Sequence, residues 1–301
     1  MKDVPAPRTS PGTLGGRAAC TRTNALLRTL EDVRREGRMA LCGYFLAGFP
    51  TPVDFFRLLR AVHQLDVVEI GIPAPEPRMD GAVIARAHDV VTRDRGLDAE
   101  TALALIGGLG PDALPQPRLA MTYADVGREL DGFLDLCRRN RIDGLLVPDV
   151  DPVEGAYVAD RARAIGLASV TLLDARADDR ALEWAVSQGD VVYVKASPAA
   201  TTGAAATIDG ELRDQLAEMR GRLRAAAPEL PVAVGIGLQR PEQLAAVAEL
   251  GFDMAVVGSK LVEHVAAGGT DLGAYLRSLR GATSRARPRR PTPPPPRHRP
   301  R

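Results

Sequence analysis

Two acidic residues, Glu69 and Asp80, are the side chains of this 301-residue chain best suited to acid–base chemistry. Glu69 lies in the apolar run 67–72, where an ionised carboxylate is costly unless it is paired, protonated or used. Asp80 follows a proline-rich loop. We interpret Glu69 as a catalytic acid/base and Asp80 as its partner across a pocket. Two alternatives stay open: Glu69 facing solvent on an edge strand, and Asp80 forming an Asp-Gly turn that caps a helix beginning near Ala82.

Two glycine-containing strand ends form a second candidate site. One expected strand ends in Gly235-Ile236-Gly237, and the next ends in Gly258-Ser259. Glycine lets backbone N–H groups approach an anion closely, and Ser259 adds a hydroxyl at the start of a helix, whose N-terminus favours negative charge. Ordinary strand-to-helix turns that need glycine are the alternative. Two such ends on neighbouring strands favour a phosphate site.

Lys195, at the end of another apolar run, is the only lysine between Lys2 and Lys260. A buried lysine could form a Schiff base with a carbonyl substrate. We favour the alternative, an outward-facing lysine paired under a helix. The small-residue segment that follows, 198–206, could form a mobile lid.

The elements that must position these residues alternate along the chain. After a first helix over 24–37, short apolar runs typical of strands buried on both faces are separated by segments with helical spacing. This alternation predicts a (β/α)8 barrel, the TIM barrel, ahead of a doubly wound sheet, because the third glycine of G-x-G-x-x-G is absent after Gly237. The expected strands are Ala40–Leu46, Val67–Ile72, Arg118–Thr122, Gly144–Pro148, Ala168–Leu173, Val191–Ala196, Pro231–Gly235 and Met254–Val257.

The composition indicates one barrel domain, residues 23–282, between two extensions. Residues 1–22 are rich in Pro, Gly, Thr and Arg, and residues 283–301 are rich in Arg and Pro, so we expect both to be disordered. The net charge is +1, but without the seven arginines of 285–301 the body has 32 basic and 38 acidic residues. We therefore expect no nucleic-acid partner, and we favour a dispensable tail over one that binds an acidic partner.

Cysteine and histidine usage places further bounds on function. The three cysteines lack metal or CxxC spacing and indicate reduced thiols in a cytoplasmic protein. The sequence predicts neither a secretory signal nor a membrane span. No metal site is predicted, and we interpret the histidines as surface or packing residues: His63, His88, His264 and His298.

Eight short strings follow one another along the chain in this order: Leu46-Ala47-Gly48-x-Pro50-Thr51, Glu69-Ile70-Gly71-Ile72-Pro73, Asp80-Gly81, Met121-Thr122-Tyr123, Asp143-Gly144-Leu145-Leu146-Val147-Pro148-Asp149, Thr202-Gly203, Val232-Ala233-Val234-Gly235-x-Gly237 and Val256-Val257-Gly258-Ser259. In this order they resemble the tryptophan synthase alpha chain family, from about residue 24 to residue 279. The string Glu-x-Gly-Ile-Pro, with Asp-Gly following it, is specific to that family.

The resemblance implies a single (β/α)8 barrel that cleaves indole-3-glycerol phosphate by a retro-aldol reaction into indole and glyceraldehyde 3-phosphate. It implies that Glu69 protonates the indole ring carbon and takes the side-chain hydroxyl proton, and that Asp80 binds the indole N–H. No cofactor is implied, and the usual partner is a beta chain that holds pyridoxal phosphate. The implied phosphate-binding residues are Gly203, Gly235, Gly237, Gly258 and Ser259, and the implied pocket or loop residues are Tyr44, Ile84, Met121, Tyr123 and Thr202.

Several positions depart from the family pattern. Residues 74–77 are Ala-Pro-Glu-Pro instead of Phe-Ser-Asp-Pro, in a loop that normally contacts the beta chain. A pocket tyrosine of the sixth strand is assigned to Val194, beside Tyr193. The departures suggest a divergent paralogue with altered coupling to a beta chain. The alternatives are a class I aldolase that uses Lys195 and a non-catalytic binding or regulatory barrel.

Overall fold

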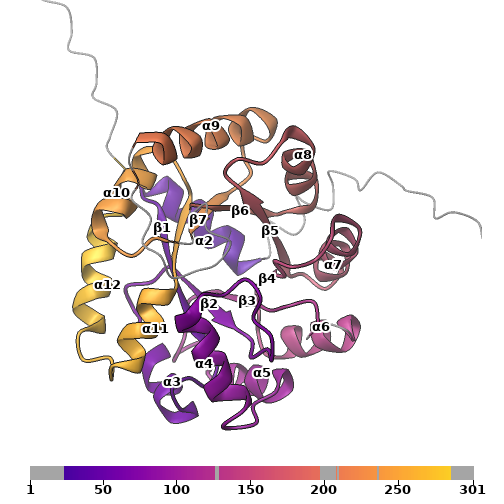
Figure 1. Ribbon diagram of the computed structural model, residues 1–301, viewed down its shortest axis with the longest axis vertical. Coiled ribbons are helices and arrows are strands. Elements are labelled where there is room, and N and C mark those ends of the chain that lie inside the picture. Colours follow the sequence, from indigo (N-terminus) through magenta and orange to yellow (C-terminus); the bar gives the residue numbers. More distant parts are fainter. Residues whose placement is uncertain (1–23, 126–128, 197–207, 209, 236, 286–301) are drawn as a thin grey trace, which may run out of the picture.

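Eight parallel strands close into a barrel in which every strand pairs with its neighbours in the sequence and β1 pairs with β8 (Figure 1). The computed structural model describes residues 24–125, 129–196, 208, 210–235 and 237–285. Closure confirms the predicted barrel and rules out the doubly wound sheet. The strands are β1 (Ala40–Leu46), β2 (Val67–Gly71), β3 (Arg118–Met121), β4 (Gly144–Leu146), β5 (Ala168–Asp174), β6 (Val191–Lys195), β7 (Val232–Gly235) and β8 (Met254–Val257).

Helices form a ring around the strands, as Figure 1 shows. Five of the described helices begin at a side chain that accepts a backbone N–H of the first turn: α2, α3, α5, α7 and α8, as Thr51 does for α3 and Asp178 for α8. No helix in the described part of the chain is long and apolar enough to span a bilayer. The helices are α2 (Ala25–Arg35), α3 (Pro52–Leu59), α4 (Ala82–Thr92), α5 (Ala99–Gly107), α6 (Leu130–Arg139), α7 (Pro152–Ala164), α8 (Asp179–Gln188), α9 (Gly210–Ala226), α10 (Pro241–Glu249), α11 (Ser259–Ala266) and α12 (Leu272–Gly281).

Strand alternation divides the buried residues between two layers. On β1, Cys42 packs with the residues that fill the barrel, whereas Leu41 and Phe45 belong to the layer between strands and helices. On β6, Val191 and Tyr193 belong to the inner layer and Val194 to the outer one. Both faces of each strand are therefore buried, which explains the continuous apolar runs in the sequence.

Helix α2 closes the N-terminal end of the barrel. Its residues Leu26, Leu27 and Leu30 are buried and pack with the inner layer. The side chain of Asn24 caps the helix by accepting the Leu27 N–H, and its amide donates to the carbonyls of residues 143 and 166, which precede β4 and β5. With this end closed, a ligand reaches the barrel interior from the opposite, carboxyl end.

Four aspartates, each directly before an even-numbered strand, join neighbouring strands at the N-terminal end. Their carboxylates accept the N–H of a residue at the start of the preceding strand, at 2.9–3.0 Å. Several are also paired with arginine, as Asp253 is with Arg220 and Arg285. A buried carboxylate is tolerated because of this pairing. The four are Asp66 with Leu41, Asp143 with Arg118, Asp190 with Ser169 and Asp253 with Val232.

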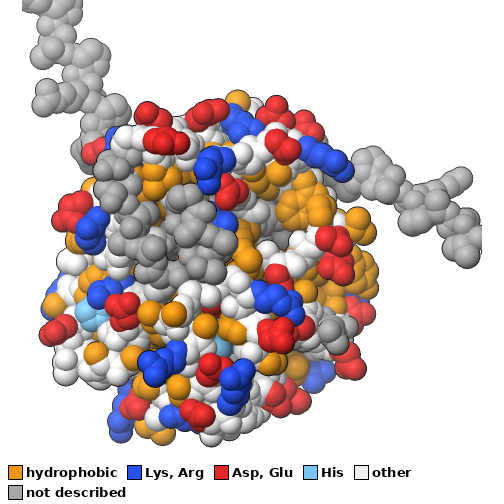
Figure 2. Space-filling model, in the orientation of Figure 1, with side chains coloured by type: hydrophobic (Ala, Val, Ile, Leu, Met, Phe, Trp, Pro, Cys, Tyr) orange, Lys and Arg blue, Asp and Glu red, His pale blue; other side chains and the backbone are white. Residues whose placement is uncertain are grey.

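The described barrel continues a few residues past the predicted boundary at 282. Thr283 is fully buried, its carbonyl accepts the Met39 N–H, and Arg285 pairs with Asp253. Residues 1–23 and 286–301 lie outside the described residues, so the predicted disorder of both extensions stays a prediction. On the face seen in Figure 2, basic and acidic side chains of the described residues are interspersed.

Candidate active site

The pocket at the carboxyl end of the barrel contains both predicted acids. Glu69 of β2 and Asp80 of the β2–α4 loop line it, together with mostly apolar or aromatic residues from all seven other strands or the loops that follow them. An apolar pocket with a few convergent polar groups is the usual form of a small-molecule site. Its lining residues are Tyr44, Glu69, Met79, Asp80, Ile84, Met121, Leu146, Pro148, Leu172, Tyr193, Gly237, Leu238, Gln239, Val256, Gly258, Ser259 and Lys260.

Glu69 is a buried carboxylic acid inside the barrel. It pairs in register with Tyr44 on β1 and Leu119 on β3, and it is 4% exposed. Because the barrel is closed, Glu69 cannot lie on an edge strand, which rules out that alternative. Burial, and then the negative charge of Asp80, raise the pKa of Glu69 to about 8. At neutral pH the side chain is therefore protonated and able to donate a proton.

Asp80 lies in the loop after β2, against Tyr123 and His88. The Tyr123 hydroxyl donates to Oδ2 of Asp80 at 2.8 Å, and Nε2 of His88 lies 3.6 Å from the same oxygen. The N-cap position of α4 is occupied by Gly81 and not by Asp80. Asp80 thus has side-chain contacts within the pocket wall that a helix-capping aspartate would not need.

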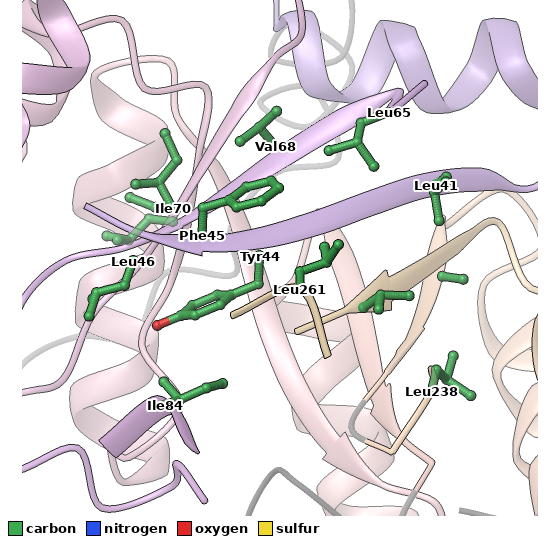
Figure 3. Packing of buried hydrophobic residues seen from close by; sticks show 14 of the residues in the cluster. Leu41, Tyr44, Phe45, Leu46, Leu65, Val68, Ile70, Ile84, Leu238 and Leu261 are labelled. Carbon is green, nitrogen blue, oxygen red and sulfur yellow. The ribbon is translucent and has the colours of Figure 1, made fainter. Parts of the chain in front are cut away.

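Two tyrosines of the pocket lining, Tyr44 on β1 and Tyr193 on β6, each lie against a glycine of the next strand. Tyr44 lies so close to Gly71 that a Cβ there would be 2.1 Å from its hydroxyl oxygen, and Tyr193 has the same relation to Gly235. Figure 3 shows Tyr44 pointing from β1 toward Ile84 of α4. Glycine is required at both positions because any larger residue would displace a pocket wall.

The glycine-containing ends of β7 and β8 meet at one side of the pocket. Gly237 has a φ of +95°, in the region that favours glycine, and it lines the pocket with Gly258. Ser259 is the first residue of α11, so its hydroxyl and the first N–H groups of that helix lie beside the pocket. This arrangement suits an anionic group.

The structure brings most of the predicted site residues together. Of those that do not line the pocket, Tyr123 is fully buried and contacts Asp80 from behind, and Gly235 ends β7 beside Tyr193. The predicted residues Thr202 and Gly203, and the predicted lid with them, lie outside the described residues. Those that line the pocket are Tyr44, Glu69, Asp80, Ile84, Met121, Gly237, Gly258 and Ser259.

Two sequence predictions on β6 need correction. Val194 was assigned to the pocket position, but it packs in the outer layer and Tyr193 lines the pocket. Lys195 was expected to face outward; alternation along β6 instead puts it on the same face as Tyr193, where its Nζ lies 3.7 Å from Asp174 of β5. Lys195 is absent from the pocket lining, and its partner is a carboxylate on the neighbouring strand.

Sequence reasoning missed several residues of the pocket and its wall. His88 was interpreted as a surface or packing histidine, but it lies beside Asp80. Among the lining residues, Leu146 and Val256 lie in the inner layer of buried residues and Leu172 packs against it, on strands for which the sequence predicted no site residue. Strand alternation could have found them, whereas nothing in the spacing of His88 indicates its contact with Asp80.

Comparisons with known proteins agree with this geometry. The family model described as "Tryptophan synthase alpha chain" matches residues 30–282. The tryptophan synthase alpha chain of Caulobacter sp. (strain K31) is 30% identical over 246 residues, 80% of this chain and 86% of that protein. The alpha chain of Novosphingobium aromaticivorans is 31% identical over 267 residues, 85% of this chain and 96% of that protein.

A solved structure extends the likeness to three dimensions. A chain in a structure of Mycobacterium tuberculosis tryptophan synthase superposes with a TM-score of 0.77 at 26% identity, covering 87% of this chain and 99% of that one. The chain described here therefore belongs to the tryptophan synthase alpha chain family, lyases that cleave indole-3-glycerol phosphate into indole and glyceraldehyde 3-phosphate in tryptophan biosynthesis.

Proposed function

We propose that Glu69 and Asp80 divide the chemistry of this cleavage between them. Glu69, protonated at neutral pH, donates its proton to the indole ring carbon that carries the glycerol phosphate chain. Asp80 accepts the ring N–H and stabilises the positive charge that develops on the indolenine. The observation that carries the proposal is a buried acid with a pKa near 8, beside a second carboxylate, in a pocket at the carboxyl end of the barrel.

The carboxyl group of Glu69 can serve both proton transfers of the reaction. After it has donated its proton, the Glu69 carboxylate takes the proton of the hydroxyl on the side-chain carbon that is bonded to the indole ring. The C–C bond then breaks, its electron pair returns to the indole ring, and the oxygen becomes the aldehyde of glyceraldehyde 3-phosphate. Glu69 ends the reaction protonated, so one residue serves as acid and then as base.

The phosphate of the substrate fits the opposite side of the pocket. Gly237 and Gly258 leave room for a close approach to the backbone, and Ser259, the first residue of α11, places the N-terminus of that helix beside the pocket. Binding at this end would place the indole ring among the apolar residues near Glu69 and Asp80. The binding energy of the phosphate would then hold the ring carbon near its acid.

Substitution of each acid tests the assignment. We expect Glu69→Gln and Asp80→Asn each to lower kcat for indole release from indole-3-glycerol phosphate by at least about 100-fold, the scale of a lost acid–base or charge-stabilising group. Glu76→Gln is the matched control, because Glu76 is an exposed acid in the same loop as Asp80. Wild-type kcat in both variants, each shown to be folded by a cooperative melting transition, would refute the assignment.

A beta chain is the expected macromolecular partner, since alpha chains of this family work with a tryptophan synthase beta chain. In this protein we propose that the coupling is weakened. The exposed part of the β2–α4 loop carries Pro75, Glu76 and Arg78, and Arg78 is paired with Glu76 and with Asp149 of the β4–α7 loop. These internal ion pairs occupy charged groups that a partner would otherwise contact.

Indole release measured with and without a beta chain from the same organism tests this coupling. We expect the turnover rate to change by less than about threefold at saturating beta chain, a shift below about 1 kcal/mol in the barrier. Stimulation of tenfold or more would contradict weakened coupling and leave the roles of Glu69 and Asp80 untouched.

A further inference from the structure

His88 is a buried histidine whose tautomer is set by the backbone. It lies on α4, is 1% exposed, and its Nδ1 accepts the Ala74 N–H at 3.0 Å. A nitrogen that accepts a hydrogen bond carries no proton, so the neutral ring must carry its proton on Nε2. Burial lowers the pKa of His88 to about 4, so the ring stays neutral at physiological pH.

The proton on Nε2 faces the carboxylate of Asp80. Nε2 lies 3.6 Å from Oδ2 of Asp80 and has no hydrogen-bond partner within the described part of the chain. At this distance the contact is longer than a hydrogen bond, but a movement of about half an ångström would close it. Catalytic hydrogen bonds are commonly long in an unliganded site and shorten when substrate binds.

Tyr123 approaches the same oxygen in the same manner. Its hydroxyl oxygen accepts the Met79 N–H at 3.2 Å and donates its proton to Oδ2 of Asp80 at 2.8 Å. The two ends of the segment 74–79 thus each supply a backbone N–H that orients a neutral side chain toward Asp80: Ala74 orients His88, and Met79 orients Tyr123.

We propose that His88 is a positioning residue that, held as the Nε2–H tautomer by the Ala74 amide, donates to Asp80 and with Tyr123 keeps that carboxylate ionised and aimed at the substrate. The inference rests on the proposed role of Asp80 in binding the indole N–H. Both donors are neutral, which matters for the chemistry. A cation at either position would cancel the negative charge that stabilises the indolenine, whereas neutral donors favour the ionised carboxylate and leave its charge in place.

Two variants separate the two interactions of the His88 ring, the hydrogen bond that Nδ1 accepts from Ala74 and the donation from Nε2 to Asp80. In His88→Asn, the side-chain oxygen can replace Nδ1 as acceptor of the Ala74 N–H, but the amide is too short to reach Asp80. In His88→Gln, the longer side chain brings an N–H donor to the position of Nε2. We expect kcat for indole release to fall about 10- to 100-fold in His88→Asn, as for a lost hydrogen bond to a charged group, and to stay within about threefold in His88→Gln.

The Asp80→Asn background shows whether His88 acts through Asp80. With enzyme in excess of substrate, adding His88→Asn to Asp80→Asn should slow indole release by less than about twofold, because the carboxylate that His88 positions is gone. An equal fold-loss in both backgrounds, or wild-type kcat in His88→Asn, would overturn the proposal for His88. Wild-type kcat in Asp80→Asn alone would instead refute the proposed function, so the two failures are distinguishable.

The tautomer of His88 can be measured on the wild-type enzyme, so this test does not depend on a variant that folds. Two-bond ¹H–¹⁵N correlation spectra of the wild-type enzyme, with the His88 signals assigned through the His88→Gln variant, should show a neutral ring protonated at Nε2. A ring protonated at Nδ1, or at both nitrogens near pH 7, would overturn the proposal even if His88→Asn failed to fold. Melting temperatures of both variants complete the set, since a residue that only packs would change stability and leave kcat unaltered.

Discussion

Replacing Glu69 by glutamine should stabilise the protein, and the gain should grow with pH. The pKa of Glu69 is about 8 in the folded protein against an ordinary value of 4.5. Between these values the unfolded chain has released a proton that the folded chain keeps, so the stability of the wild type falls as pH rises. Glutamine is close to glutamate in shape and does not titrate, so the free energy of unfolding of Glu69→Gln does not fall with pH for this reason.

The size of the effect follows from the shift. Each pKa unit corresponds to about 1.4 kcal/mol, so the wild type should lose about 3 kcal/mol of unfolding free energy by pH 7 and about 5 kcal/mol by pH 9, relative to a permanently protonated acid. At pH 5 the loss is about 1 kcal/mol. The free energy of unfolding of Glu69→Gln minus that of the wild type should therefore rise by about 4 kcal/mol from pH 5 to pH 9.

Urea unfolding followed by circular dichroism at pH 5, 7 and 9 measures this difference. All other titrating groups are common to both proteins and cancel in the subtraction. Because the charge of Asp80 is the second cause of the raised pKa, the rise should be smaller when the same comparison is made in an Asp80→Asn background. Glu76→Gln, at an exposed site, should show no such rise. Parallel stability curves for the wild type and Glu69→Gln would refute the inference that Glu69 is a buried acid protonated at neutral pH.

Three further predictions concern the pocket and the aspartates at the N-terminal end of the barrel. Since catalysis begins with protonated Glu69, kcat/KM for indole release should fall tenfold per pH unit above about pH 8, and a profile flat to about pH 10 would contradict this. Gly235→Ala should lower the free energy of unfolding in urea by about 1–3 kcal/mol and raise KM, because its Cβ would lie 2.1 Å from the Tyr193 hydroxyl. Adding Tyr193→Phe should restore part of that free energy, and a double variant as unstable as Gly235→Ala would show that the Tyr193 hydroxyl is not the cause. Asp253→Ala should destabilise by about 3–5 kcal/mol in the same assay, because it leaves buried Arg220 without its carboxylate, and a cost below about 1 kcal/mol would refute that pairing.

The order of the elements and the chemistry of the central acid could be predicted from the sequence. The runs at β1 and β8 were predicted to the residue, and the others to within two residues at either end, because strands buried on both faces leave continuous apolar segments between polar turns. An acid within one of those segments is conspicuous for the same reason. Glycine pairs at two strand ends likewise carry a local signal of close backbone approach.

What tertiary structure decided is which side chains meet. Alternation shows that Tyr193 and Val194 face opposite sides of β6, but only the closed barrel shows that Tyr193 faces inward. The Tyr123 hydroxyl meets Asp80 across 43 positions of sequence, and His88 reaches the same oxygen from α4. The pKa near 8 belongs to the assembled pocket, because it arises from burial and from the charge of Asp80. Sequence by itself determined which residue types lie on each strand and loop; the enclosed, low-dielectric interior, which exists only after folding, decided which of them share protons.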